Sequence, residues 1–203
     1  GVQTCSSDLT AMELLTRDDL MTYAEYEVAR PEYRRNIIAM KRDRVVQVGN
    51  NSTWHFENRD IMRYQIQEMI RCEVMTEPDP IEGELDAYNP LIPLTNEISV
   101  TLMFEYELRE EREKYLPLLV DIDEHVFLRI GDTEPIKAIF DIGQITPDKV
   151  SSVQYVKFHL TDEQTELLRT EGTVLRAIVT HPHYNTQSVL GENVRRAIQD
   201  DPV

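Results

Sequence analysis

Residues 58–93, NRDIMRYQIQEMIRCEVMTEPDPIEGELDAYNPLIP, decide how we expect the rest of the chain to fold. The first part has the pattern of an amphipathic helix, because apolar residues recur at i, i+4, i+7 and i+8 and form one stripe. Asn58 is a suitable N-cap, and Asp60 lies in the first turn, where a carboxylate interacts favourably with the helix dipole. The stripe consists of Met62, Ile66, Met69 and Ile70.

A second face of the same helix carries long polar side chains at intervals of four residues. Guanidinium groups bind carboxylates and phosphates through two parallel hydrogen bonds, so this row predicts either an anion-binding surface or pairing inside the protein. The following residues, 77–86, are predicted to form an acidic loop punctuated by prolines, and we favour its carboxylates as the internal partners. The row consists of Arg59, Arg63, Gln67 and Arg71, with Tyr64 beside it.

Two functions are compatible with this stretch. The first is a non-enzymatic binding or accessory protein that uses the arginine-lined helix and the turn at Tyr88, Asn89 and Pro90 as its recognition surface. The alternative is an enzyme that acts on a small anionic substrate through an arginine-lined pocket, with Glu68 as the acid or base. The candidate residues for binding a ligand or partner are Arg59, Arg63, Tyr64, Gln67, Glu68, Arg71, Tyr88 and Asn89.

No catalytic motif supports the enzyme alternative. The sequence contains no GxGxxG, GxxxxGK[ST], GxSxG or ExxH pattern, and its few glycines stand singly. We therefore favour a protein that is not an enzyme, and we assign no catalytic residues and no cofactor.

The charge of the chain limits its partners. The 203 residues carry a formal net charge of −16, which argues against general binding to nucleic acids or anionic membranes. Residues 17–71 hold ten basic against nine acidic side chains, whereas residues 72–203 hold eleven against twenty-six. The N-terminal third is therefore the only part where an anionic group would not be repelled.

The cysteines and the hydropathy predict a cytoplasmic protein. Cys5 and Cys72 form neither a disulfide framework nor a metal motif, so we expect two reduced thiols. No apolar run approaches the roughly 20 residues that span a bilayer. The first residues lack both the basic and the apolar region of a signal peptide.

The predicted fold is α+β, with N-terminal helices, a β-hairpin, the central amphipathic helix and an antiparallel or mixed sheet. Residues 1–15 are expected to be a weakly ordered lead-in to a single domain, 16–203. Thr16 should cap a helix that ends near residue 29, and Pro31 should open a second helix whose Ile38 faces the core. Residues 44–58 should form the hairpin.

Strands dominate the second half of the prediction. Pro117 should kink or split a helix over residues 108–121, because proline removes a helical hydrogen bond. Shorter helices are expected over residues 161–169 and from residue 192. Strands are expected over residues 97–106, 125–130, 135–141, 153–160, 173–180 and 184–190.

The last predicted hairpin turn contains two histidines. His181 and His183 flank Pro182, so both imidazoles could ligate one transition metal, but two ligands are too few for a site. We therefore favour a hairpin turn and predict no metal. The other histidines, His55, His125 and His159, are scattered singly along predicted strands.

Two motifs carry a family resemblance. YQIQEM at residues 64–69 and ELDAYNPLIP at residues 84–93 closely resemble an uncharacterised bacterial family, catalogued as domain of unknown function thirty-five-oh-one. Further matching segments are RDDL at 17–20, EYE at 25–27 with Arg30, FENR at 56–59, and His181-Pro182 with Tyr184.

The resemblance implies a single-domain bacterial protein, but no activity and no catalytic residues. Genes of this family often lie near those of rubrerythrin-like and iron–sulfur proteins. The resemblance therefore implies an accessory role in redox or oxidative-stress metabolism, with a redox protein as the expected partner. This implication is an association, not a mechanism.

Overall fold

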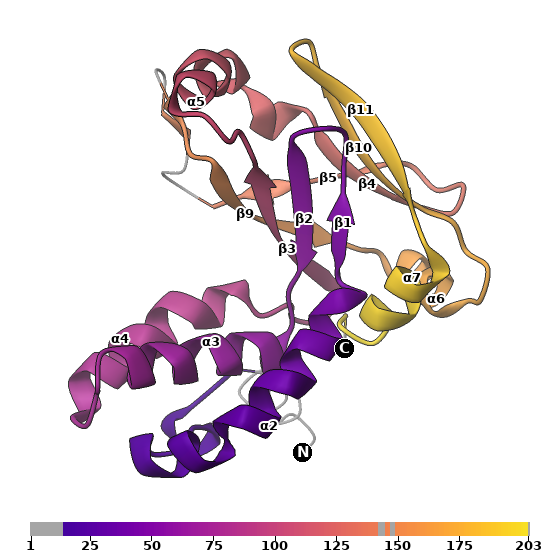
Figure 1. The fold of residues 1–203 in the computed structure, drawn as a ribbon. Helices are drawn as coiled ribbons and strands as arrows, with labels where there is room; N and C mark the ends of the chain where they lie inside the picture. The colour runs from indigo at the N-terminus through magenta and orange to yellow at the C-terminus, as the bar shows by residue number, and fades with distance from the viewer. Residues whose placement is uncertain (1–13, 142–144, 147–148, 203) are drawn as a thin grey trace, which may run out of the picture.

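Two clusters of buried apolar side chains, with no member in common, organise the described part of the chain (Figure 1). The structure is a computed structural model that describes residues 14–141, 145–146 and 149–202. One cluster lies among the N-terminal helices and the other between two antiparallel sheets. The predicted α+β class is therefore confirmed. We call the two parts the helical lobe and the sandwich lobe.

The helical lobe consists of three helices and two short 3-10 turns, which lie together at the bottom of Figure 1. In chain order these are η1 (Arg17–Asp19), α2 (Tyr23–Arg42), α3 (Arg59–Cys72), α4 (Pro78–Tyr88) and η2 (Asn89–Leu91). The central helix α3 contacts both α2 and α4, and the predicted N-cap Asn58 accepts from the backbone N–H of Ile61. The buried cluster consists of Leu15, Ile61, Met62, Ile66, Ile70, Met75, Leu85 and Ile92.

The start of α2 differs from the prediction. Thr16 caps only η1, and α2 begins after Thr22, whose side chain and that of Glu25 form a capping box. The helix then continues through Pro31, which was expected to open a separate helix. Proline removes one helical hydrogen bond, but α2 contacts α3 on both sides of it, through Tyr26 with Glu68 and Tyr33 with Arg63. Tertiary packing therefore overrides the local break.

The predicted acidic loop is the helix α4. Pro78 stands at its start, where proline is tolerated because the missing N–H has no helical partner there. Leu85 is buried in the helical lobe, and Ile81 packs against the same cluster. The prolines at 78 and 80 were therefore misread as loop signals, whereas they lie in the first turn of a helix.

The sandwich lobe is built from two antiparallel sheets that share one core. Sheet A has the order β1-β2-β3-β9-β6, and sheet B has the order β11-β10-β4-β5. Alternate residues of each sheet point inward, so that Trp54 and Phe158 of sheet A pack in one cluster with Leu128 and Val179 of sheet B. The strands of sheet A are β1 (Val45–Gln47), β2 (Ser52–Phe56), β3 (Glu97–Phe104), β9 (Val153–His159) and β6 (Ile139–Phe140). Those of sheet B are β11 (Tyr184–Leu190), β10 (Leu175–His181), β4 (Val126–Ile130) and β5 (Ile136–Lys137).

The strand predicted over residues 135–141 is divided between the sheets. β5 pairs with β4 in sheet B, whereas β6 pairs with β9 in sheet A, and the buried Ala138 lies between them. A further short pair, β7 (Ile145–Thr146) with β8 (Lys149–Val150), was not predicted. The segment before β4 does break at Pro117, into α5 (Arg109–Tyr115), η3 (Leu116–Leu119) and η4 (Ile122–Glu124).

The C-terminal elements follow the prediction closely. They are α6 (Asp162–Arg169), the β10–β11 hairpin and α7 (Glu192–Ile198). Tyr184 ties this hairpin to the β1–β2 hairpin, because its hydroxyl donates to the Val48 carbonyl at 2.7 Å and accepts from the Asn51 N–H at 3.0 Å. Gly49 (φ +73°) leaves room for that hydroxyl, which would lie 2.7 Å from a Cβ placed there.

Within the described residues, no helix is long and apolar enough to cross a membrane.

Candidate functional site

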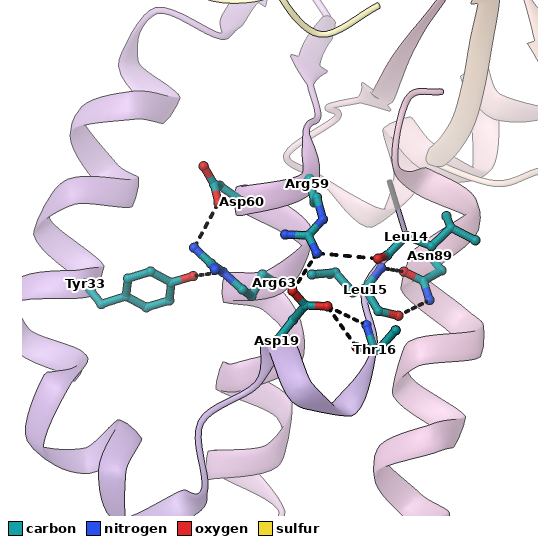
Figure 2. A network of polar contacts seen from close by, with 9 residues as sticks. All are labelled: Leu14, Leu15, Thr16, Asp19, Tyr33, Arg59, Asp60, Arg63 and Asn89. Atoms are coloured by element: carbon teal, nitrogen blue, oxygen red, sulfur yellow. Dashed lines mark hydrogen bonds and ion pairs between the residues drawn. The ribbon is translucent and has the colours of Figure 1, made fainter. Parts of the chain in front are cut away.

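The first residue of the α3 polar row binds the segment that precedes α2. The Arg59 guanidinium donates to the Asp19 carboxylate at 2.6 Å and reaches the Leu14 carbonyl at 3.5 Å (Figure 2). Burial opposes ionisation of Asp19, but hydrogen bonds from Arg59 and Thr16 outweigh it, and the pKa of Asp19 is lowered. Arg59 therefore joins η1 to the helix.

Arg63 is paired within its own helix and with α2. It donates to the Asp60 carboxylate at 2.9 Å and to the Tyr33 hydroxyl at 2.8 Å (Figure 2). Its guanidinium carbon also lies 5.7 Å from the centre of the Tyr33 ring. These contacts use both the charge and the hydrogen-bonding capacity of Arg63 inside the lobe.

Two side-chain amides each bind the backbone N–H and the backbone carbonyl of one residue, as a neighbouring β-strand would. Gln67, 1% exposed, accepts from the Met21 N–H at 2.5 Å and donates to the Met21 carbonyl at 3.2 Å. Asn89 does the same for Leu15, at 2.8 Å from its N–H and 2.9 Å from its carbonyl. Each amide satisfies both backbone groups of one residue in an extended segment. These polar contacts hold residues 14–21 on the helices, together with the burial of Leu15 in the apolar cluster.

Glu68 is hydrogen-bonded to two residues of α2. The Arg30 guanidinium donates to both of its carboxylate oxygens at 2.8 Å, and the Tyr26 hydroxyl donates to one of them at 2.5 Å. The hydrogen bonds from Arg30 outweigh burial and lower the pKa of Glu68. A carboxylate held in the ionised form by three donors is poorly placed to act as an acid or base. Arg71 forms an ion pair with Glu27, also on α2.

The internal pairing that we favoured is present, but its partners differ from those predicted. The arginines of the row form ion pairs with Asp19, Asp60 and Glu27, and none of these carboxylates belongs to residues 77–86. The acidic segment forms a helix on which Glu82 and Asp86 are exposed and Glu84 is half-buried. Glu82 of this helix forms an ion pair with Arg17 of η1 at 3.8 Å.

The two tyrosines among the candidates take part in packing. Tyr64 lies edge-on to Tyr33, with ring centroids 6.0 Å apart, and the Lys41 ammonium lies 6.0 Å from the Tyr64 ring. Tyr88 is half-buried and packs against the cluster of the helical lobe. None of the eight candidates lines the described groove of about 840 Å³ between η1, the start of α2 and the end of α3. The arginine row therefore does not form the closed, concave pocket that the enzyme alternative requires.

A basic surface lies instead on the outward face of α2. We call it the α2 basic face, and it has Ile38 at its centre, 47% exposed rather than in the core as predicted. Positions 34, 38, 41 and 42 follow the helical repeat and share one side, with position 35 at its border. The face consists of Arg34, Arg35, Ile38, Lys41 and Arg42.

The histidines form a group that was not foreseen. His125, expected to stand alone, lies beside His181, with ring centroids 5.1 Å apart. The buried His181 accepts from the His183 N–H at its Nδ1, so its Nε2 carries the proton and donates to Asp121 at 2.7 Å. Both ring nitrogens are thereby used. Across the described ranges, no group of three His, Cys, Asp or Glu side chains is placed to hold a metal ion.

A comparison with known families identifies the family of this chain. The family model described as "Protein of unknown function (DUF3501)" matches residues 14–201. The chain belongs to the DUF3501 family. The resemblance seen in the sequence is thus confirmed.

One solved structure is similar over almost its whole length. It is described as a novel protein of unknown function from Burkholderia pseudomallei, and it is 36% identical to this chain with a TM-score of 0.85. The similarity covers 92% of this chain and 98% of that one. No curated protein matches the chain. Function must therefore be argued from the geometry of this DUF3501 member itself.

The two long motifs of the resemblance have a structural explanation. They contribute Gln67, Glu68 and Asn89, whose side chains tie residues 14–21 and α2 to the rest of the helical lobe. No sequence signal identifies Met21 and Leu15 as their partners, because the contacts are made to backbone atoms. The α2 basic face, by contrast, is readable from the helical spacing of its arginines.

Proposed function

We propose that this protein is a non-enzymatic binding or accessory protein that recognises an acidic partner protein through the α2 basic face. The observation that supports it most strongly is the state of the cations on this face. Arg34, Arg35 and Arg42 are exposed, and none has a carboxylate partner among the described residues. The Lys41 ammonium lies 6.0 Å from the centre of the Tyr64 ring and forms no ion pair with a carboxylate of the described residues.

Three exposed cations elsewhere on this acidic chain each pair with a carboxylate. Arg109 pairs with Glu113 at 2.7 Å, Lys137 with Glu124 at 2.5 Å, and Arg196 with Glu171 at 2.8 Å. A local group of cations without carboxylate partners, on a protein of net charge −16, therefore contrasts with these paired sites. Such a group attracts an acidic surface and orients it before contact.

The composition of the face fits protein recognition. Arginines around an exposed aliphatic side chain combine charge complementarity with an apolar anchor, and arginine is enriched at the residues that dominate protein interfaces. The partner class that we propose is an acidic redox protein, of the rubrerythrin-like or iron–sulfur type that the family association suggests. The chain's overall charge opposes nucleic acid as the ligand.

The surface proposed here differs from the one expected from the sequence. Arg63, Arg71 and Gln67 already have partners inside the lobe, and Asn89 holds the Leu15 backbone. Using them for recognition would leave their present partners unsatisfied, at a cost of about 1–3 kcal/mol for each buried group. The α2 basic face can bind without that loss.

The test is capture of the partner from native cells, with identification by mass spectrometry. The triple variant Arg34→Glu, Arg35→Glu and Arg42→Glu should weaken the reconstituted complex at least about tenfold, and added salt should weaken the wild-type complex. The partner should be acidic. A charge-matched control, Arg109→Glu, Lys114→Glu and Lys137→Glu, changes the net charge equally on α5 and β5, outside the helical lobe.

Retained binding by the α2 variant would contradict the proposal. So would a basic partner, or a control variant that loses the complex to the same extent. Circular dichroism of both variants should match that of the wild type, since every substituted side chain is largely exposed.

A further inference from the structure

A small pocket lies where the helical lobe meets sheet A, and neither the α2 basic face nor the family assigns it a role. Its volume is about 190 Å³. Pro90 and Leu91 of η2 form one wall, and Ile139 and Phe140 of β6 form another, so the walls are apolar. Ser99 of β3 and Lys157 of β9 also line it. Ligand sites are often found at such junctions between two structural units.

Ser99 supplies a hydroxyl to the lining of the pocket. The residue is 3% exposed, and its hydroxyl has no hydrogen-bond partner among the described residues but is not one of the fully buried unpaired atoms, so it is open to the pocket. A hydroxyl in that position binds water, which a polar ligand atom can replace. The hydroxyl of Ser99 is therefore available to a polar atom placed in the pocket.

Lys157 supplies a second donor beside it. Ser99 and Lys157 are directly opposite in the β3–β9 register, so their side chains leave the same face of the sheet as neighbours. The Lys157 ammonium donates to the Glu97 carboxylate at 2.6 Å and to the Ile92 carbonyl at 3.2 Å. An ammonium has three N–H groups, so one remains for a ligand.

The charge around these donors favours a neutral ligand. Glu97 neutralises Lys157. A carboxylate ligand would approach the Glu97 carboxylate without a free positive charge to offset the repulsion, whereas a carbonyl oxygen accepts from Ser99 and Lys157 without it. An apolar cavity of about 150 Å³ is known to bind benzene, so the present volume accommodates a ring with one polar substituent.

We propose that this junction pocket binds a small neutral amide or carbonyl compound with an aromatic or branched apolar body. The carbonyl oxygen accepts from Ser99 and Lys157, and the body packs between η2 and β6. Such a ligand would contact both lobes at once. This inference goes beyond the proposed function and does not depend on it.

Three probes of similar size test the proposal: benzamide, benzoate and benzylamine, each titrated into the isotope-labelled full chain and followed by NMR. Benzamide should give saturable shifts at Ser99, Lys157 and Ile139, and the two charged probes should bind at least about tenfold more weakly. Ser99→Ala should weaken benzamide about tenfold, because it removes one donor. Ser188→Ala, a serine of β11, is the matched control and should leave the affinity unchanged.

Absence of saturable shifts with benzamide would overturn the proposal. Equal binding of all three probes would do so too, since the pocket would then recognise only the ring. Unchanged affinity in Ser99→Ala would show that the hydroxyl is not the recognition group. The comparison of the three probes on the wild-type chain decides the matter even if Ser99→Ala fails to fold.

Discussion

The helical lobe and the sandwich lobe are stabilised in different ways. In the sandwich lobe, aromatic and branched side chains from both sheets form one continuous core around Trp54, Phe56 and Phe158. The helical lobe has a smaller apolar cluster and relies on polar contacts that cross between its segments, such as those of Gln67 and Glu68. The comparison teaches that a row of long polar side chains on a helix can serve as scaffold.

The two lobes can be followed separately in solution. Trp54, the single tryptophan, is fully buried in the sandwich lobe, so its fluorescence reports that core. The long helices lie in the helical lobe, so far-ultraviolet circular dichroism is dominated by it. If the lobes differ as described, the two signals need not change together on unfolding.

The largest effect is expected from truncating the sandwich core. Phe158 is fully buried and stacks on Trp54, with ring centroids 5.8 Å apart. Phe158→Ala should lower the free energy of unfolding by about 3–5 kcal/mol, because it removes buried surface and leaves a cavity. Denaturant unfolding followed by Trp54 fluorescence measures it. A loss below about 1 kcal/mol would mean that the core is not packed as described.

A smaller effect is expected from the polar contacts of the helical lobe. Glu68→Gln keeps the shape of the side chain but removes the charge that binds Arg30, and it should cost about 2 kcal/mol. The loss of stability should shift the unfolding transition followed by circular dichroism more than the one followed by Trp54 fluorescence. Glu82→Gln is the control, since Glu82 is exposed and lies 3.8 Å from Arg17. Equal stability of the two variants would refute the structural role of Glu68.

Acid should weaken the helical lobe by a still smaller amount. The pKa of Glu68 and that of Asp19 are lowered in the folded protein, because Arg30 and Arg59 donate to the ionised forms. The unfolded chain therefore binds protons more tightly, and this part of the stability is fully present above the ordinary pKa of about 4.5 for glutamate.

That contribution is lost as the pH falls from the ordinary pKa values through the lowered ones. An acid titration should therefore show a loss of helical dichroism that begins below about pH 4.5 and is reduced in Glu68→Gln. The same acid midpoint in the wild type and the variant would show that Glu68 does not couple the helical lobe to pH.

The elements with strong periodicity could be predicted from the sequence. The apolar stripe of α3, its Asn58 cap, the β1–β2 hairpin and the break at Pro117 were all expected. Each depends on residues close in sequence, which is the range over which propensity and pattern act.

The errors arose where distant residues decide the structure. Pro31 was taken as a helix start, but packing of α2 on α3 keeps the helix continuous across it. Pro78 was taken as a loop residue, but Leu85 needs a helix to reach the cluster. Ile38 was placed in the core because the phase of the helix against its neighbour was unknown.

The candidate site could be located but not interpreted from the sequence. Gln67 and Asn89 were singled out, yet their partners are backbone groups, which carry no sequence signature. The contact of His125 with His181 required the pairing of β4 with β10, and strand order is not encoded in local pattern. What the sequence cannot supply is the partner of each side chain.

The most direct test of the scaffold role of the α3 polar row is hydrogen exchange at two backbone amides. The Met21 N–H is bound by Gln67, and the Leu15 N–H is bound by Asn89. In the wild type both should be protected from exchange. In Gln67→Leu, which keeps the site filled but removes the acceptor, Met21 should lose its protection while Leu15 retains it. Unchanged exchange at Met21 in the variant would contradict the scaffold role.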